Sequence, residues 1–379
     1  MPQQVRTRQS QRGYRASGKE ALRPDSRPSR ADQSSLLLSP QTFDTRLIRA
    51  DAMGEHPVTL KRPEGSAAGQ RAPEITAAIC TYNRYDVLPD AIASLANQAL
   101  DPDSLEILII DNSADRAGQS DYWAAHEIPT NARLLVDTTA GLSRARNTAL
   151  RASRASVIAF LDDDAVAMPE WCPSLVDSFR THPDAGIVGG PVEPIWPEKS
   201  PSWLHKWQRG FLTIVDHGEA FRVLQEDEWL AGTNIAFRNS ALQAVGGFHE
   251  GLGRTGSSLL SNEELAVSRK VREAGFVAYY EPKARVMHRV HSNRTTQQWL
   301  RQRVCWQAVS DLLANATHPE SARCWSELAQ YQSKLPVEMR GVRGLFLDMQ
   351  EPDDFYQQCR ALEALMHLAL NRARDPECE

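Results

Sequence analysis

The chain has 379 residues, of which 41% are hydrophobic and 24% charged, and its formal net charge is −5. These values allow one large α/β domain with an appendage, or two domains. No apolar run approaches the roughly 18 to 20 residues that cross a bilayer, which argues against a polymer-extruding membrane synthase. The six cysteines are scattered without a CxxC pair, so we expect reduced thiols and a cytoplasmic location instead of a disulfide or zinc framework.

The N-terminal segment differs in composition from the rest of the chain. Residues 1–74 carry 13 Lys and Arg against 8 Asp and Glu, and the first thirty residues almost lack large apolar side chains. This composition is typical of disorder. We predict a disordered basic extension over residues 1–70 that does not bind nucleic acid, with contact to an anionic membrane left open. Met1 and Met53 are both candidate starts.

Strands and helices alternate after this extension, which predicts a mostly parallel sheet with right-handed crossovers. Strands are expected over 75–80, 105–110, 133–136 and 157–161, and helices over 86–99 and 142–152. Ligands of such sheets gather beyond the carboxyl ends of the strands. Polar residues stand at those ends here: Thr81–Arg84, Asp111–Asn112 and Asp162–Asp164.

Three consecutive carboxylates, Asp162, Asp163 and Asp164, end the apolar run 157–161. Adjacent acids repel one another and cannot be buried without a cation that neutralises them. Oxygen ligands at a strand end suit Mg²⁺ or Mn²⁺, which commonly bind phosphate-bearing substrates as well. A solvated acidic turn is the alternative interpretation of these three residues.

The second half of the chain is less regular. We expect strands over 186–189, 230–238, 277–280 and 284–288, a helix over 263–274, and amphipathic helical structure from 295 to about 373. Gly251–Gly256 matches the letters GxGxxG, but no buried strand precedes it, so it indicates a loop. Glu263 and Glu264 open the expected helix. They are either plain capping acids or a candidate general base.

The order of these motifs resembles the family 2 glycosyltransferases over about residues 74–292. The motifs that carry the resemblance are Cys80–Arg84, Asp111–Ser113, Gly141–Asn147, Asp162–Asp164, Gly232–Asn234, Phe237–Arg238, Gly246–Phe248, Asn262–Glu264 and His288. The resemblance implies a GT-A fold, which is a Rossmann-like α/β fold with a mostly parallel central sheet and flanking helices. The domain would span residues 71–294, followed by a helical C-terminal segment over 295–379.

The resemblance also implies roles for individual residues in binding the nucleotide-sugar donor. The donor-binding candidates are Thr81, Asn83, Arg84, Asp111, Arg144, Arg146, Asn147, Asp162 and Asp163. The metal candidates are Asp162, Asp164 and His288, around Mn²⁺ or Mg²⁺. The family commonly carries Glu-Asp where this chain has Glu263-Glu264, so Glu264 is the expected catalytic base and Glu263 the reserve.

The implied activity is an inverting, metal-dependent transfer of a sugar from a nucleoside-diphosphate donor, expected to be UDP-linked. The acceptor would be a glycan, a lipid-linked molecule or a small molecule in polysaccharide or glycoconjugate biosynthesis. A sugar nucleotidyltransferase is an alternative, although Thr81–Arg84 is not the glycine-rich loop that it needs. A non-catalytic binding module is another.

The helical segment 295–379 lies outside this resemblance. Trp299, Leu300, Val304, Trp306 and Val309 form an apolar stripe on its first helix, with Arg294, Arg301 and Arg303 nearby. The stripe indicates either packing onto the catalytic domain or a peripheral contact with the inner face of a membrane. The oligomeric state has no signature in the sequence.

Overall fold

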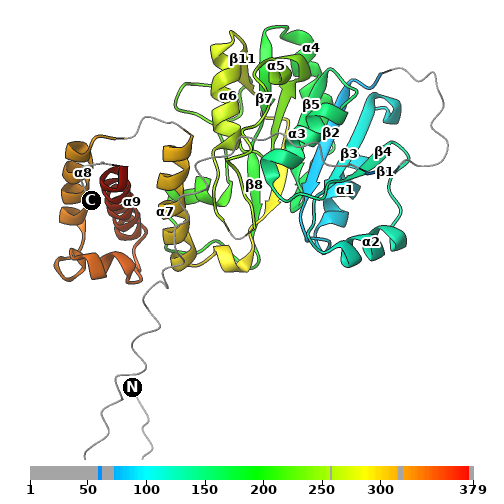
Figure 1. Cartoon of the computed structure of the whole chain (residues 1–379). Helices are drawn as coiled ribbons and strands as arrows, with labels where there is room; N and C mark the ends of the chain where they lie inside the picture. Colours follow the sequence, from blue (N-terminus) through cyan, green and yellow to red (C-terminus); the bar gives the residue numbers. More distant parts are fainter. Residues whose placement is uncertain (1–58, 62–71, 257, 315–318, 375–379) are drawn as a thin grey trace, which may run out of the picture. The chain divides into compact units, whose positions relative to one another are not determined.

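The computed structural model of the chain describes residues 59–61, 72–256, 258–314 and 319–374 (Figure 1). Most of the extension predicted over residues 1–70 therefore lies outside the described residues. Within that range, Thr59–Lys61 forms a short strand, β1, which pairs antiparallel with β4 (Ala132–Val136).

A nine-stranded sheet forms the centre of the described chain. Its order is β1, β4, β3 (Leu105–Asp111), β2 (Ile75–Thr81), β5 (Val157–Asp162), β10 (Ile235–Arg238), β7 (Ala185–Gly189), β11 (Val277–Tyr280) and β9 (Arg222–Val223). β2, β3, β4, β5, β7 and β11 share one direction, and β1, β9 and β10 run against it. A second, three-stranded sheet has the order β6 (Ala165–Ala167), β12 (Val286–Arg289) and β8 (Val192–Ile195).

Helices cover both faces of the large sheet because its central strands are apolar on both sides. All seven residues of β3 are buried. One face packs against α1 (Leu88–Ala96), α2 (Arg116–Ala125) and α4 (Trp171–Thr181). The other packs against α3 (Leu142–Ala152), α5 (Asn239–Ala244) and α6 (Glu263–Glu273). The predicted α/β class with a mostly parallel sheet and flanking helices is confirmed.

The C-terminal segment is helical, as predicted, and its apolar core is shared with Leu204, Leu212 and Val290 from the preceding part of the chain. It contains α7 (Gln297–Leu313), α8 (Ser321–Lys334) and α9 (Pro352–Arg374), which stand side by side in Figure 1. Short 3₁₀ turns occur along the whole described chain: η3 (Pro102–Ser104), η4 (Lys206–Leu212) and η5 (Ser292–Arg294) precede this segment, and η6 (Val337–Met339) and η7 (Val342–Phe346) lie within it. Trp299, Leu300 and Val304 are buried against Phe355 of α9, so most of the stripe on α7 packs inward.

Two further findings bear on the expectations from composition. No helix of the described residues combines the length and the apolar character needed to cross a membrane. The described cysteines, Cys80, Cys172, Cys305, Cys324 and Cys359, are free thiols.

Candidate active site

A cavity of about 810 Å³ opens at the carboxyl ends of β2 and β5. The segments around it are the turn after β2, the acid triplet, η4, the loop before α6, the β12–η5 connection and α7. Of the predicted site residues, the cavity is lined by Thr81, Arg84, Arg146, Asp162, Asp163, Asp164, Glu263, Glu264 and His288. The structure therefore brings together motifs that lie more than 200 residues apart in the sequence.

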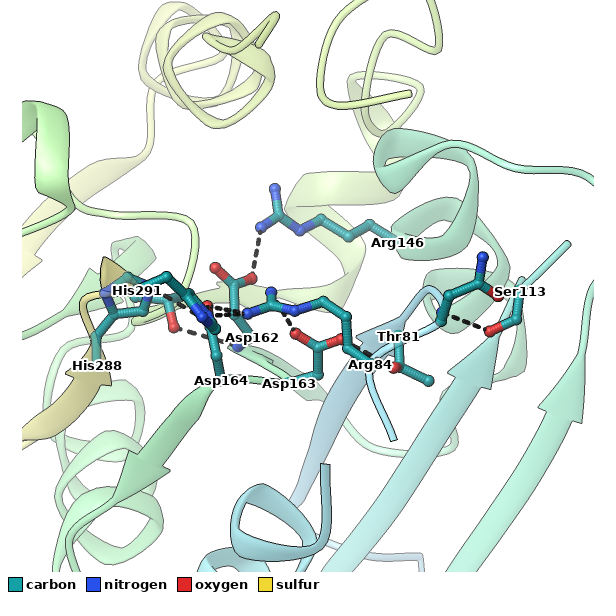
Figure 2. Close-up of polar contacts among 11 residues, drawn as sticks. Thr81, Arg84, Ser113, Arg146, Asp162, Asp163, Asp164, His288 and His291 are labelled. Atoms are coloured by element: carbon teal, nitrogen blue, oxygen red, sulfur yellow. Dashed lines mark hydrogen bonds and ion pairs between the residues drawn. The ribbon is translucent and has the colours of Figure 1, made fainter. Parts of the chain in front are cut away.

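The three adjacent carboxylates have different environments, which Figure 2 shows. Asp163 is 4% exposed and accepts hydrogen bonds from Thr81 Oγ1 at 2.8 Å and from Arg84 Nη1 at 2.8 Å. Burial raises the pKa of Asp163 to about 7. Both Asp163 oxygens are thus used inside the protein, where they hold the turn after β2 against the end of β5.

Asp164 is the most strongly charge-stabilised of the three. Its Oδ2 accepts from Arg84 Nη2 at 2.6 Å and lies 3.1 Å from His291 Nε2, and its Oδ1 lies 3.3 Å from His288 Nε2. Burial opposes ionisation here, but His288, His291 and Arg84 hold the pKa of Asp164 well below its usual range. This carboxylate is therefore ionised at neutral pH.

The predicted metal ligands are close enough together to bind one ion. One ligand atom from each of Asp162, Asp164 and His288 lies within 4.8 Å of the others. Two carboxylate oxygens with one imidazole nitrogen suit Mn²⁺ or Mg²⁺. The buried Nδ1 of His288 has no hydrogen-bond partner among the described residues. The residues present fit a divalent cation.

Arg146 of α3 connects the acid triplet to the loop that precedes α6. Its guanidinium is 2% exposed and donates to Glu263 Oε1 at 2.8 Å, Asp162 Oδ1 at 3.4 Å and the carbonyl of Gly232 at 3.1 Å. The guanidinium also lies over the rings of Phe160 and Phe248, at 5.7 and 5.5 Å. These contacts use the charge of Arg146 within the protein, where it positions two acids of the site.

The adjacent glutamates Glu263 and Glu264, like the three aspartates, have different environments. Glu263 is buried and its Oε1 pairs with Arg146, whereas Glu264 is half-buried and forms no ion pair among the described residues. The Oε2 atom of each glutamate has no hydrogen-bond partner among those residues. Burial and the charge of Glu263 raise the pKa of Glu264 to about 8. A carboxylate with a raised pKa and a free oxygen in a cavity has the properties of a general base.

Four predicted donor-binding residues do not line the cavity. The Asp111 carboxylate is fully buried and accepts from Tyr85 Oη at 2.9 Å and Trp123 Nε1 at 2.6 Å. The Asn147 amide bonds the backbone of the Gly247–Phe248 turn, Arg144 pairs with Asp137, and Asn83 is exposed at a positive φ of 54°. Their roles in donor binding stay predictions.

The cavity also contains residues that the sequence analysis did not assign to the site. His291 faces Asp164, and the spacing His288-x-x-His291 just after a strand was a signal for it. Gln307 of α7 donates to Asn262 Oδ1 at 2.9 Å, and Asn262 donates to Asp311 of α7 at 2.7 Å. Asn262 has a φ of 76° and directly precedes Glu263. Helix α7 therefore supports the turn that presents both glutamates.

Known proteins resemble this chain in the same region. The family model described as "Glycosyl transferase family 2" matches residues 76–246. A glucosyl-dolichyl phosphate glucuronosyltransferase of Haloferax volcanii is 29% identical over 254 residues, which are 66% of this chain and 80% of that protein. The succinoglycan biosynthesis protein ExoM of Rhizobium meliloti is 26% identical over 230 residues, 59% of this chain and 70% of ExoM.

Among solved structures, a mannosyltransferase of Pyrobaculum calidifontis in complex with GDP-Man and Mn²⁺ aligns with a TM-score of 0.49. Its sequence identity is 18%, and the alignment covers 83% of this chain and 92% of that one.

Proposed function

Because this chain is a family 2 glycosyltransferase with its family domain over residues 76–246, we propose that it transfers a sugar, with inversion, from a UDP-sugar to an acceptor hydroxyl. The observation that carries this proposal is that one cavity contains both a candidate metal site and a separate candidate base. Asp162, Asp164 and His288 form a group that fits a metal, and Glu264 has a free carboxylate oxygen. A glycosyl transfer needs both a charge-neutralising group and a base.

The chemistry assigned to the protein's own residues begins with Glu264. Its carboxylate takes the proton of the acceptor hydroxyl, and the acceptor oxygen forms a bond to the anomeric carbon of the donor. The bond from that carbon to the diphosphate oxygen breaks, and its electron pair leaves with the nucleoside diphosphate. Attack from the face opposite the leaving group converts an α-linked donor into a β-linked product.

Asp162, Asp164 and His288 would hold the divalent cation. When bound, the cation supplies positive charge that stabilises the departing diphosphate. Arg146 keeps Glu263 and Asp162 in place through its buried ion pairs. Glu263 is then a positioning residue, and its charge contributes to the raised pKa of Glu264.

The acceptor class is proposed from the names of the relatives. One relative is named for a glucosyl-dolichyl phosphate substrate and another for succinoglycan biosynthesis. These names support an acceptor in glycan or glycoconjugate synthesis, either lipid-linked or soluble. UDP as the donor nucleotide, a cytoplasmic location and contact with a membrane are predictions from the sequence.

The test is release of nucleoside diphosphate from a panel of UDP-, GDP- and dTDP-sugars with Mn²⁺ or Mg²⁺, repeated with EDTA. We expect turnover of one donor that EDTA and Asp164→Ala both abolish. As a matched control, Asp177→Ala removes an exposed carboxylate on α4 and is expected to leave turnover unchanged. The absence of turnover across the panel, together with no calorimetric binding of UDP and metal, would overturn the proposal and favour a non-catalytic module.

A further inference from the structure

Three arginines line the cavity without an ion-pair partner among the described residues. They are Arg254 in the loop before α6, Arg294 in η5 and Arg303 in α7. All three lie beyond residue 246, where the match to the family model ends. Arg84 and Arg146, which line the same cavity, each form ion pairs with carboxylates. The three arginines therefore differ from their neighbours in having no carboxylate partner among the described residues.

Arg303 is the most buried of the three, at 8% exposed. Its Nη2 donates to Ser261 Oγ at 2.8 Å and Gln307 Oε1 at 2.9 Å, and its guanidinium lies 5.6 Å from the centre of the Phe211 ring. Its Nη1 is buried and has no hydrogen-bond partner among the described residues. A buried charged donor without a partner is costly, which indicates that a ligand supplies the missing acceptor.

The charges of these arginines act on one another across the cavity. Burial, together with the charge of Arg254, lowers the pKa of both Arg294 and Arg303 to about 10. Both side chains stay positively charged at neutral pH, so the repulsion between each of them and Arg254 persists. An anion placed between them would remove this repulsion and would satisfy the free donors.

The three arginines connect two parts of the cavity. Arg294 ends η5, three residues after His291, which faces Asp164, so it belongs to the part proposed to hold the metal and the donor diphosphate. Arg303 donates to Ser261 Oγ in the turn directly before Glu263 and Glu264, so it belongs to the part that holds the proposed base. The charge of Arg254 acts on both of the other arginines.

The part of the cavity near Arg303 also has an apolar wall. Phe211 of η4 lies against the Arg303 guanidinium, and Trp207 of η4 and Trp229 line the same cavity. Trp207 is 69% exposed. Aromatic rings of this kind pack against sugar rings or hydrocarbon chains. A ligand in this part of the cavity would combine an anionic group with a less polar body.

We infer that the acceptor carries a phosphate group, which Arg254 and Arg303 bind beside the hydroxyl that Glu264 deprotonates, while Phe211 and Trp207 contact the rest of the acceptor. A phosphate presents oxygens in several directions and can therefore accept from two guanidinium groups at once. This inference rests on the proposed transferase function. It adds the chemical class of the acceptor, either a sugar phosphate or a lipid-linked phosphodiester.

The first experiment measures binding of phenyl phosphate to the full-length protein by calorimetry, with UDP and Mg²⁺ present at saturation. We expect phenyl phosphate to bind, and we expect Arg303→Gln to weaken this binding at least about tenfold because it removes a charge-assisted hydrogen bond. Arg303→Lys, which keeps the charge, is expected to retain part of the affinity. Arg180→Gln removes an exposed charge on α4 and serves as the control.

Two results of that experiment would overturn the inference. If phenyl phosphate binds only when UDP is absent, the arginines bind the donor diphosphate. If Arg303→Gln and Arg180→Gln behave alike, Arg303 does not contact the phosphate. Melting curves of each variant show whether an effect reflects a loss of folding.

The second experiment compares acceptors that differ in the phosphate. Octyl β-glucoside is the neutral probe, octyl phosphoryl glucose represents the lipid source, and glucose 1-phosphate represents the soluble source. We expect transfer to one of the two phosphates and none to the neutral glucoside. Donor hydrolysis without acceptor reports on the proposed function separately. If hydrolysis proceeds and transfer shows no preference for phosphate, the inference about the acceptor fails while the transferase function stands.

Discussion

The adjacent glutamates Glu263 and Glu264 are expected to respond oppositely to the same conservative change. Glu263→Gln removes the closer of two carboxylates around the buried guanidinium of Arg146. Breaking a buried ion pair from one side typically costs 3 to 5 kcal/mol, and because Arg146 keeps Asp162 and the Gly232 carbonyl we expect about 3 kcal/mol. Glu264→Gln removes a carboxylate that the folded protein holds with a pKa raised from 4.5 to about 8.

The magnitude for Glu264→Gln follows from this pKa. At about 1.4 kcal/mol for each tenfold change in proton affinity, the upper limit is about 5 kcal/mol of destabilisation by the ionised carboxylate. Glu264 is only half-buried, so solvent reduces this limit and we expect a gain of about 2 kcal/mol. For a domain of this size the gain corresponds to a rise in Tm of roughly 4 °C.

The pH dependence distinguishes this explanation from a general effect of the substitution. Because the pKa of Glu264 is higher in the folded than in the unfolded protein, its ionisation destabilises the fold as the pH rises from about 4.5 to about 8. The stability gained by Glu264→Gln should therefore be larger at pH 8.5 than at pH 5.5. Denaturant unfolding of both variants and the wild type at these two pH values measures it.

Activity provides the second half of the test. Glu264→Gln should lower transfer by about 10² to 10⁴-fold, and wild-type kcat/KM should rise with pH toward a midpoint near 8, where the base becomes ionised. A Glu264→Gln variant that is less stable than the wild type at pH 8.5, or that keeps full transfer activity, would refute the assignment of Glu264 as an unpaired base.

Three other predictions concern the groups around the base. Gly232→Ala places a Cβ 2.6 Å from Arg146 Nη2, so it should lower both stability and transfer, whereas Gly341→Ala has open space and should change neither; melting and turnover assays compare them. Gln307→Ala removes a hydrogen bond to Asn262, so it should lower the free energy of unfolding by about 1 kcal/mol and reduce kcat more than donor affinity. Steady-state kinetics and calorimetry of UDP binding measure the two effects, and an unchanged kcat would contradict the prediction. Asp164→Asn should abolish Mn²⁺ binding in a calorimetric titration, and tight binding by this variant would place the metal elsewhere.

Apolar pattern predicted the strands of the first half well because those strands are buried on both faces. The strand predicted from residue 75 and the helix predicted over 142–152 appear with nearly the same bounds. The strand expected over 230–238 begins only at Ile235. The residues before it form a turn in which the Asn234 side chain donates to the carbonyls of Pro191 and Ala284, contacts that no local pattern encodes.

Helices α2, α4 and α5 were not predicted from the sequence. In α2, polar residues predominate and the buried residues are Gln119 and Trp123, so it has almost no apolar stripe. The expected continuous helical pattern after residue 295 is divided into α7, α8 and α9, and α9 packs against the other two. Between α8 and α9 the chain forms the short turns η6 and η7.

Motif order located the edge of the sheet where the site lies, but it could not show which acids already have partners. Asp111 and Asp162 both follow buried strands and look alike in sequence. Tyr85 and Trp123, which pack over Asp111, satisfy its carboxylate, whereas Asp162 stays partly exposed at the cavity. The distinction depends on which side chains the fold brings over each strand end, and this information is non-local.

The support of Asn262 by α7 has a consequence for the order in which the parts of the site form during synthesis. All strands of both sheets lie before residue 290, and the helix that holds the turn in front of the glutamates lies after it. A ribosome-bound chain can therefore complete its sheets while the base still lacks its support. The proposed base, Glu264, gains this support only after Gln307 and Asp311 have been synthesised and have packed against Asn262.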